Sequence, residues 1–148
     1  MLGYSANAIN IKVVDGDTLN LDGQKIRLAG LDAPELKQKC RHKNNIEWDC
    51  GLCAKAFLEG LISNREISCY NTGTDYYKRA ISICYADSVE INKEIVKAGY
   101  AIAYVKYSKL YSEDERFAKL HKKGIWAGTF DVPEVYRKKK KKMKSIGK

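Results

Sequence analysis

The first part of the chain alternates hydrophobic and polar residues in short stretches. Residues 9–14 read Ile-Asn-Ile-Lys-Val-Val, which has the period of two that is typical of a half-buried strand. Asp22-Gly23 lies between two further stretches of this kind and favours a two-residue hairpin turn. Two more β-type runs flank a turn segment at residues 71–75. The pattern predicts five short strands, at residues 9–14, 18–21, 25–28, 66–70 and 80–85.

A helical spacing of hydrophobic residues begins after the third predicted strand. Residues 50–64 are expected to form a helix with one apolar stripe. The stripe consists of Cys53, Ala56, Phe57, Gly60 and Leu61. Because strands and helices are interspersed in this order, the pattern predicts an α+β fold, mainly β, in which a small five-stranded barrel carries packed helices.

Two more helices are predicted from their end signals. Asp87-x-x-Glu90 has the form of a capping box, and the helix that it opens is expected to end at Gly99. Ser112-x-x-Glu115 has the same form, and its helix is expected to end at Gly124. The predicted buried face of this last helix consists of Phe117 and Leu120.

Length and composition place the chain among single-domain globular proteins. It has 148 residues, of which 45% are hydrophobic and 30% are charged, so it is long enough to bury one sizeable core. No apolar run approaches the roughly 20 residues that a membrane-spanning helix needs. We therefore expect no membrane insertion, and we expect a monomer.

The positive charge is concentrated at the end of the chain. There are 27 Lys and Arg residues against 18 Asp and Glu residues, and the net charge is +9. Residues 137–148 hold eight of the basic residues and no acidic one. We expect a domain at residues 1–136 and a flexible basic tail at 137–148. The tail either attracts polyanions such as nucleic acid or is an inert solubilising end.

Acidic residues follow two neighbouring predicted strands. Asp15 and Asp17 lie between the first two strands, where Asp-Gly also fits a plain turn. Asp32 follows the third strand, just before Pro34, which ends regular pairing. Two acidic loops that leave adjacent strands can converge on one hard cation, and calcium prefers such oxygen ligands. Glu35 is close enough in sequence to share this site without having to be a ligand.

Two arginines could complete a site for a phosphate. Arg27 lies on the third strand, on the face opposite Ile26 and Leu28, and Arg79 lies at the start of the fifth. A guanidinium group has the planar fork that matches phosphate geometry. The alternative is that both are ordinary surface residues.

The five cysteines leave several alternatives open. Cys40-x-His42 and Cys50-x-x-Cys53 offer four soft ligands, so a zinc knuckle is one interpretation, although the spacing of the first pair is poor. Cys69 and Cys84 fall on two predicted neighbouring strands, and we expect them to be buried free thiols.

Four segments, in this order and spacing, resemble one known family. They are Val-Asp-Gly-Asp-Thr at 14–18, Arg-Leu-Ala-Gly-Leu-Asp-Ala-Pro-Glu at 27–35, Asp-Tyr-Tyr-Lys-Arg-Ala at 75–80 and Gly-Ile-Trp at 124–126. Through them the chain resembles the staphylococcal nuclease-like (thermonuclease) family over most of residues 9–127. This family has a five-stranded OB-fold barrel with three helices, which agrees with the strands and helices expected above.

The resemblance implies a calcium site beside a general base. Asp17 and Asp32 would bind Ca²⁺ through their carboxylates, and Ala33 would bind it through its backbone carbonyl. The family often has Thr at the position of Ala33, but a backbone ligand tolerates Ala. Glu35 would be the general base, and Asp15 would lie just behind the metal ligands.

The resemblance also implies contacts with nucleic acid. Arg27 and Arg79 would grip the scissile phosphate and act as catalytic residues. Tyr77 would bind a neighbouring phosphate, and Tyr107 would line the nucleotide pocket. Lys78 stands where the family usually has Gly, and it either alters the turn before Arg79 or adds a phosphate contact.

In cysteine-bearing relatives, two cysteines bracket the loop beside the active site. By this resemblance, Cys40 and Cys50 would form a disulfide, while free thiols and zinc stay open as alternatives. A disulfide implies an oxidising compartment, so we expect a secreted or periplasmic protein. Against this expectation, no complete signal peptide precedes the predicted fold.

The resemblance therefore implies a Ca²⁺-dependent nuclease that hydrolyses DNA and RNA with low sequence specificity. It would cleave the 5′ P–O bond and leave 3′-phosphorylated products. One alternative is a catalytically silent OB-fold module that binds nucleic acid or a protein, and another is a zinc-bearing adaptor. The enzyme is favoured because its five catalytic and metal-binding side chains are all present: Asp17, Arg27, Asp32, Glu35 and Arg79.

Overall fold

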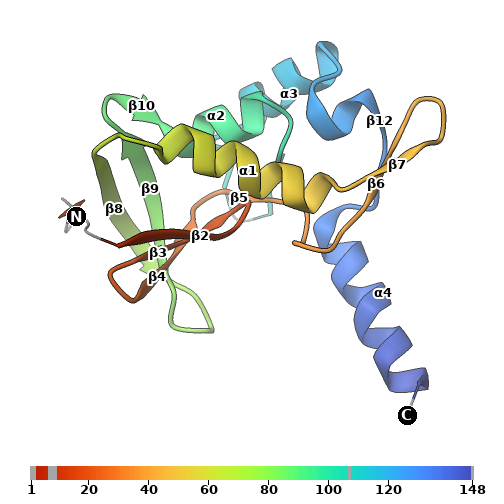
Figure 1. Ribbon diagram of the computed structural model, residues 1–148, viewed down its shortest axis with the longest axis horizontal. Helices are drawn as coiled ribbons and strands as arrows, with labels where there is room; N and C mark the ends of the chain where they lie inside the picture. Colours follow the sequence, from red (N-terminus) through yellow and green to blue (C-terminus); the bar gives the residue numbers. More distant parts are fainter. Residues whose placement is uncertain (1–2, 7–9, 107, 148) are drawn as a thin grey trace.

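The computed structural model describes residues 3–6, 10–106 and 108–147. Within these residues it is an α+β protein with four α-helices and three sheets (Figure 1). The largest sheet has the strand order β1-β8-β9-β4-β3-β2, and β10 pairs with the edge of β9. Its strands are β1 Gly3–Ala6, β2 Ile11–Asp15, β3 Thr18–Leu21, β4 Gln24–Leu28, β8 Ile67–Thr74, β9 Ala80–Ala86 and β10 Val89–Glu90.

The hairpin of β3 and β4 confirms the predicted turn and faces. Asp22 and Gly23 both have positive φ angles, 50° and 90°, as a tight two-residue turn requires. Ile26 and Leu28 are buried, whereas Arg27 between them is half-buried on the other face. The alternation of β4 therefore sends two side chains into the core and directs Arg27 away from it.

All five predicted strands are present, but the sheet is larger than predicted. The strand β8 continues through Thr74, so the predicted turn at 71–75 is wrong. The chain instead turns after Asp75, whose backbone carbonyl accepts a hydrogen bond from the backbone N–H of Lys78. The pairings among the described strands leave β1 and β2 at the two ends of the path. A closed five-stranded barrel thus stays a prediction.

The helix α1, Cys50–Ile62, packs on β2 and on α2. Its buried residues are Cys50, Gly51, Ala54 and Leu58. The predicted stripe is wrong in part because the helix is rotated relative to it. Ala56 and Gly60 are exposed, and Phe57 and Leu61 are only half-buried beside the core.

The helices α2, Ile91–Lys97, and α3, Ser112–Leu120, lie near their predicted places. Neither has a side-chain cap of the predicted kind. The carboxylate of Asp87 accepts a hydrogen bond from the backbone N–H of Glu66, and the carboxylate of Glu115 accepts one from the backbone N–H of Ala103. Both carboxylates therefore accept hydrogen bonds from other segments of the chain, and neither one caps a helix.

The predicted buried face of α3 is also wrong. Its buried residue is Ala118, while the exposed fractions of Phe117 and Leu120 are 36% and 77%. The helix packs on α2, and the Lys97 ammonium group lies over the Phe117 ring, 5.1 Å from its centre. The helix thus buries a small side chain and leaves its larger apolar side chains partly or mostly exposed.

Two small sheets surround the main one. One pairs β5, Leu31–Asp32, with β11, Ile102–Ala103. The other has the order β12-β6-β7 and contains β6 Cys40–His42, β7 Glu47–Trp48 and β12 Gly128–Thr129, with the short 3-10 helix Gly124–Ala127 before it. The strand β5 contains Asp32 and lies at the candidate site described below.

Two disulfides connect parts of this framework. Cys40 and Cys50 are joined, which ties β6 to the start of α1 and removes both sulfur atoms from any zinc knuckle. Cys69 and Cys84 are also joined, so their prediction as free thiols is wrong. They lie directly opposite each other in the β8–β9 pair, where side chains on neighbouring strands approach most closely. Cys53 is free.

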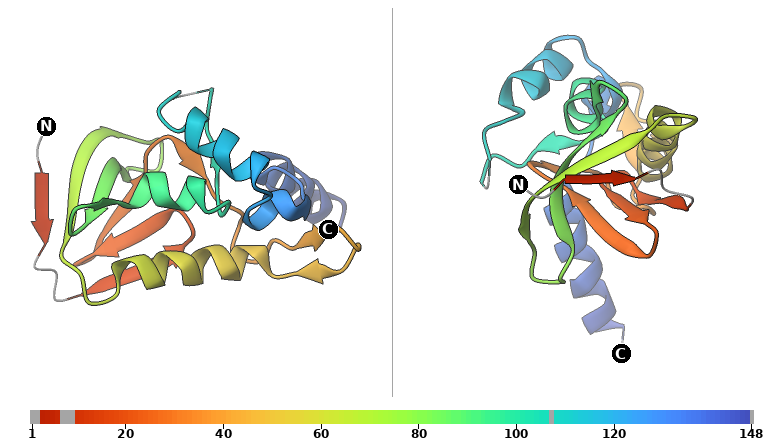
Figure 2. Two further views of the ribbon diagram at one scale, coloured as in Figure 1. Left: turned by 90° about the horizontal axis from the view of Figure 1, so that it is seen from above. Right: turned by 90° about the vertical axis from the view of Figure 1, so that its left-hand side faces the viewer.

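The basic end of the chain is helical in the structure, and the division into a domain at 1–136 and a flexible tail at 137–148 stays a prediction. Residues Pro133–Ile146 form the helix α4, which begins within the predicted domain and projects away from the body of the protein (Figures 1 and 2). Pro133 at its first turn is buried, and the lysines at 138–142 and 144 are exposed. None of the described helices is long and apolar enough to cross a membrane.

Candidate active site

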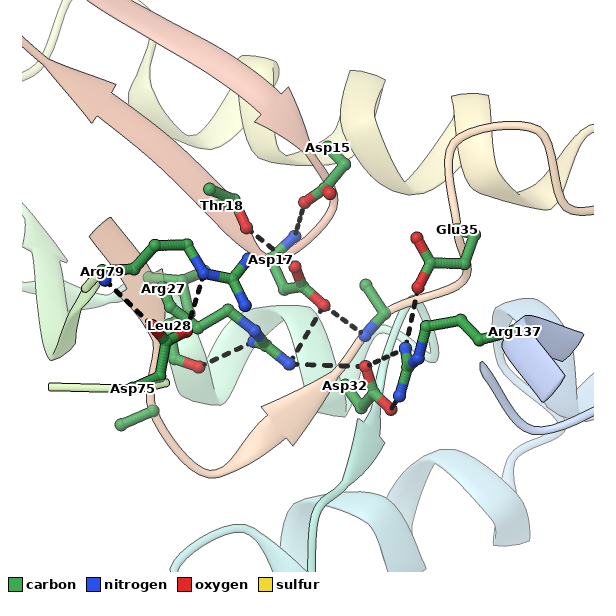
Figure 3. Close-up of polar contacts among 12 residues, drawn as sticks. Asp15, Asp17, Thr18, Arg27, Leu28, Asp32, Glu35, Asp75, Arg79 and Arg137 are labelled. Atoms are coloured by element: carbon green, nitrogen blue, oxygen red, sulfur yellow. Dashed lines mark hydrogen bonds and ion pairs between the residues drawn. The ribbon is translucent and has the colours of Figure 1, made fainter. Parts of the chain in front are cut away.

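A cavity of about 660 Å³ opens where three distant segments of the chain meet. These segments are the β2–β3 turn, the stretch from the end of β4 through β5 to Glu35, and the β8–β9 turn. The second turn of α4 adds Arg137 to the wall. Figure 3 shows the charged side chains around the cavity: Asp15, Asp17, Arg27, Asp32, Glu35, Asp75, Arg79 and Arg137.

Gly16 lets the β2–β3 turn approach its neighbours closely enough to place two carboxylates. A Cβ atom at Gly16 would lie 2.7 Å from the Cβ of Ala54 in α1 and 2.8 Å from the Cβ of Ala33. Such distances leave no room for a side chain. The register of the β2–β3 pair also shifts just before this turn, as in a β-bulge. The close approach fixes Asp15 and Asp17 against β5.

Asp17 is buried and fully hydrogen-bonded. Its Oδ1 accepts a hydrogen bond from the Thr18 hydroxyl at 3.0 Å, and its Oδ2 accepts one from the backbone N–H of Ala33 at 2.9 Å. Burial raises the pKa of Asp17, but the charge of Arg27 and the hydrogen bonds to its oxygens outweigh this effect. The pKa is therefore lowered, and the carboxylate is ionised at neutral pH.

Arg27 bridges the two buried carboxylates. Its Nη2 lies 3.4 Å from Oδ2 of Asp17 and 3.3 Å from Oδ1 of Asp32. Its Nη1 donates to the backbone carbonyl of Leu28 at 3.0 Å, which orients the guanidinium plane. One nitrogen thus holds together carboxylates from two loops, which the sequence analysis expects to converge on a cation.

Asp32 also binds Arg137, more than a hundred residues later in the chain. Arg137 Nη1 donates to Oδ1 at 3.1 Å and Nη2 donates to Oδ2 at 3.0 Å. This is the two-bond geometry that a guanidinium group forms with a carboxylate. Burial raises the pKa of Asp32, and although the contacts with Arg137 act in the opposite direction, the net shift is upward.

The same arginine binds Glu35. Its Nη1 lies 2.7 Å from Oε1 of Glu35. The backbone N–H of Glu35 donates to Oε1 of Gln38 at 3.1 Å, and the Gln38 amide donates to the backbone carbonyl of Asp131 at 2.7 Å. Burial lowers the pKa of Arg137, but the hydrogen bonds to both carboxylates outweigh it and leave the pKa raised. Gln38 therefore links the Glu35 loop to the segment before α4.

Asp15 lies behind this group. It accepts a hydrogen bond from the backbone N–H of Asp17 at 3.0 Å. Burial and then the negative charge of Asp17 raise the pKa of Asp15 to about 7. Asp15 is thus more readily protonated than Asp17, whose pKa is lowered.

Arg79 enters the cavity from the β8–β9 turn. Its Nε donates to Oδ2 of Asp75 at 2.7 Å, and its backbone N–H donates to Oδ1 of the same residue at 2.9 Å. Asp75 also accepts the backbone N–H of Tyr77 at 2.9 Å. These three bonds fix the turn and the direction of the Arg79 side chain, whose guanidinium lies 5.5 Å from the centre of the Tyr77 ring.

The sequence model of the family described as "Staphylococcal nuclease homologue" matches residues 25–128. The chain belongs to this family.

Similar proteins include two that are called uncharacterized endonucleases. The Haemophilus influenzae protein is 31% identical over 139 residues, which cover 88% of this chain and 72% of that protein. The Escherichia coli O157:H7 protein is 29% identical over 138 residues, covering 88% and 84%. The succinoglycan biosynthesis protein ExoI of Rhizobium meliloti is 32% identical over 117 residues, covering 77% of this chain. The match spans only 61% of ExoI.

The nuclease-family fold brings most of the predicted site residues together. One cavity is lined by Asp15, Asp17, Arg27, Asp32, Glu35, Tyr77 and Arg79. Ala33 is buried beside it and donates its N–H to Asp17. Lys78 lies outside the cavity lining and has a φ of 63°, the left-handed conformation in which Gly is favoured. Tyr107 lies outside the described residues.

Three residues of the site were missed by the sequence analysis. Asp75 belongs to a matching segment and precedes Arg79 by four residues, so its role as an orienting partner could have been predicted. Tyr104 lines the cavity without a motif of its own. Arg137 was assigned to the tail, although it is the one arginine in a run of lysines. A single arginine among lysines indicates a specific contact, because a guanidinium group can form two parallel hydrogen bonds with a carboxylate and an ammonium group cannot.

The donor chemistry of the cavity fits a hard cation. No group of three or more His, Cys, Asp or Glu residues that could hold a metal ion occurs in the part of the chain that the structure describes. However, Asp17 and Asp32 are held on one Arg27 nitrogen, and the oxygens of such neighbouring carboxylates are the ligands that Ca²⁺ prefers. The two carboxylates therefore suit calcium, and backbone carbonyls and water would complete its shell.

Proposed function

We propose that this protein is a Ca²⁺-dependent nuclease that hydrolyses phosphodiester bonds of DNA and RNA with low sequence specificity. One observation carries the proposal. Two arginines, an acidic group suited to act as a base and two neighbouring buried carboxylates line a single cavity. The family membership and the endonuclease names of two relatives support the same conclusion.

Arg27 and Arg79 bind the scissile phosphate in this proposal. They reach the cavity from β4 and from the β8–β9 turn, and each has an acidic partner that fixes its direction. The phosphoryl oxygens gain negative charge as water attacks phosphorus. Preorganised guanidinium groups stabilise that charge more strongly in the transition state than in the substrate.

Glu35 acts as the general base. It orients a water molecule in line with the bond to the 5′ oxygen and accepts its proton as the water oxygen attacks phosphorus. The bond from phosphorus to the 5′ oxygen then breaks, the leaving 5′ oxygen takes a proton from solvent water, and the phosphate stays on the 3′ oxygen. The side chain of Glu35 is about one-third exposed at the cavity, so water reaches it.

Asp17 and Asp32 would hold Ca²⁺, with the backbone carbonyl of Ala33 as a third protein ligand. The bound cation supplies Lewis acidity and a template for the phosphate. Asp15 lies behind these ligands and sets the position of the turn through its bond to the Asp17 N–H. Thr18 and the Ala33 N–H keep the Asp17 carboxylate oriented.

The nucleic acid is held through its backbone and its base faces. Tyr77 at the rim of the cavity, Lys78 beside it and Tyr107 are the proposed contacts. The exposed lysines of α4 offer further positive charge to the backbone of a long nucleic acid. Because contacts with phosphates and stacking surfaces carry little sequence information, either DNA or RNA in single- or double-stranded form is expected to bind.

We extend the proposal to the cellular location and to the closure of the main sheet. Two disulfides lie within the described residues, and disulfides persist in oxidising compartments. We therefore propose a secreted or periplasmic location. We also propose a monomer in which the main sheet closes into a five-stranded OB-type barrel.

The test is digestion of labelled single-stranded DNA and RNA by the purified protein, with Ca²⁺ or with EGTA. We expect Ca²⁺-dependent cleavage and 3′-phosphate ends by mass spectrometry. Arg79→Ala should reduce the rate at least about 10²-fold. Arg65→Ala, which removes an exposed arginine outside the cavity, should leave the rate unchanged. Tight DNA binding without cleavage under any divalent cation would instead indicate a catalytically silent binding module.

A further inference from the structure

We infer that Arg137 competes with the metal ion for the carboxylates of the site, so that a divalent cation binds only when α4 releases this arginine. The inference rests on the proposed function, because it concerns the cation that Asp32 would bind. In this inference, the first half of α4 acts as an intramolecular inhibitor of the site. The proposed function by itself includes no such inhibitor.

The oxygens of Asp32 are already engaged. Oδ1 accepts hydrogen bonds from both Arg137 Nη1 and Arg27 Nη2, and Oδ2 accepts one from Arg137 Nη2. A carboxylate oxygen has two lone pairs, so Oδ1 has no lone pair left for a cation. A Ca²⁺ ion bound at Oδ2 would lie close to the Arg137 guanidinium group, and the two positive charges would repel each other.

Arg137 also engages the proposed base. Its Nη1 is shared between Oδ1 of Asp32 and Oε1 of Glu35, at 3.1 and 2.7 Å. While Oε1 of Glu35 accepts this bond, that oxygen is occupied by the guanidinium group and does not face a water molecule. The same arginine therefore occupies both a proposed metal ligand and the proposed base, and one movement would free both.

The charge balance explains why the arginine lies there. The Asp32 side chain is only 2% exposed, and a buried carboxylate is costly unless a positive group compensates it. Arg137 provides that compensation together with Arg27. A divalent cation would provide it as well, so the cation and Arg137 are alternatives for the same negative charge.

The helix that carries Arg137 has few other contacts with the body of the protein. Its residues from Lys138 onward are exposed, and the ion pairs of Lys138 and Lys139 are with Glu134 and Asp131, at the start of the helix or just before it. The helix is anchored at buried Pro133, and the preceding segment is anchored by the Gln38 bond. Loss of the Arg137 contacts would free α4 to move about this anchor, as its projection from the body indicates (Figure 1).

The residue type supports a specific role. Arg137 is followed by five consecutive lysines, and a lysine ammonium could not form the parallel pair of bonds seen with Asp32. The structure thus separates one arginine that is directed into the site from lysines that are directed into solvent. This difference also supplies a matched control, since Lys141 has the same charge on the same helix and is exposed.

The first experiment measures Ca²⁺ affinity without any nucleic acid, by equilibrium dialysis with ⁴⁵Ca²⁺. Arg137→Gln should bind Ca²⁺ about tenfold more tightly than the wild type, because the lost charged hydrogen bonds no longer compete. Lys141→Gln should stay within about twofold of the wild type, since it removes a distant and screened charge. Circular dichroism of each variant checks that the fold is intact. Equal affinity of Arg137→Gln and wild type would overturn the inference and leave the nuclease proposal standing.

The second experiment follows hydrogen exchange in residues 133–146. Ca²⁺ should accelerate exchange in the wild type, because it displaces Arg137 and loosens α4. Arg137→Gln should exchange faster than the wild type without Ca²⁺ and should not respond to it. Slower exchange of α4 on Ca²⁺ binding would overturn the inference.

The variant Asp32→Asn tests the proposed calcium site itself, whereas Arg137→Gln tests the competition for that site. Asp32→Asn should bind no Ca²⁺ in the range where the wild type does, because a proposed ligand is neutralised. If neither the wild type nor Arg137→Gln binds Ca²⁺, the calcium dependence of the proposed function fails, and this inference fails with it.

Discussion

The carboxylate of Asp75 holds Arg79 at two points, through the side-chain Nε at 2.7 Å and through the backbone N–H at 2.9 Å. The first bond sets the direction of the guanidinium group, and the second fixes the backbone of the turn from which it extends. Arg79 is thus positioned before any substrate arrives. Such preorganisation lowers the cost of reaching the transition state.

Asp75→Asn should therefore impair catalysis although Asp75 is not expected to touch the phosphate. We expect kcat to fall about tenfold or more, because Arg79 loses a charged partner and gains freedom to leave the productive orientation. Steady-state cleavage of a dinucleotide measures this effect. Asp114→Asn on α3, outside the cavity lining, is the matched control. An unchanged kcat in Asp75→Asn would show that Arg79 needs no such partner.

The same contact predicts a pH dependence of stability. Burial raises the pKa of Asp75, but the hydrogen bonds and charge of Arg79 outweigh it, so the pKa is lowered from its ordinary value of 3.8. Because the pKa is lower in the folded state, the stabilisation is fully present above pH 3.8 and is lost as the pH falls through the folded pKa. Urea unfolding should find Asp75→Asn less stable than the wild type at pH 7, with the difference vanishing in acid. A difference independent of pH would contradict this interpretation.

Lys78 has a backbone conformation that suits Gly better. Its φ angle is 63°, and a left-handed conformation costs an ordinary L-residue about 1–2 kcal/mol. Lys78→Gly should raise the free energy of unfolding by about 0.5–1 kcal/mol, since the greater entropy of Gly in the unfolded chain offsets part of the gain. Lys78→Ala keeps the unfavourable geometry and should give no such gain. Equal stabilisation by both substitutions would point to the lost lysine charge and not to the backbone.

The Cys69–Cys84 disulfide should stabilise the sheet without taking part in the chemistry. It closes a sequence separation of 15 residues, for which the entropy model gives about 3 kcal/mol. Cys69→Ala combined with Cys84→Ala should lower the free energy of unfolding by about this amount, measured by urea denaturation. Since neither residue lines the cavity, cleavage at a temperature where the variant stays folded should continue at the wild-type rate. A loss of activity in the folded variant would show that the sheet and the site are coupled.

The features that sequence predicted well are those set by neighbouring residues. The Asp22-Gly23 turn was predictable because two positive φ angles are required there and these residues tolerate them. The position of Arg27 opposite Ile26 and Leu28 follows from the strand period alone. Site residues were identified largely through the family's motifs, because an Asp-Gly pair by itself fits an ordinary turn.

The failures concern contacts between distant segments. The disulfide of Cys69 and Cys84 depends on the register of β8 and β9, which a one-residue shift would change. Phe117 and Leu120 fit a helical stripe, but α3 packs through the small Ala118 instead. Arg137 meets Asp32 across a separation of 105 residues, and no local pattern specifies such a pair.

The central claim is that Glu35 is the base in phosphodiester cleavage. Its most direct test compares Glu35→Gln with the wild type in kcat on single-stranded DNA with Ca²⁺, and in affinity for a dinucleotide whose scissile linkage is a non-cleavable phosphonate. The exposed Glu59→Gln on α1 is the control. We predict that kcat of Glu35→Gln falls by about 10²–10⁴-fold while its affinity for the phosphonate stays within about twofold of the wild type. Turnover near that of the wild type would contradict the account, because it would remove Glu35 from the role of the base.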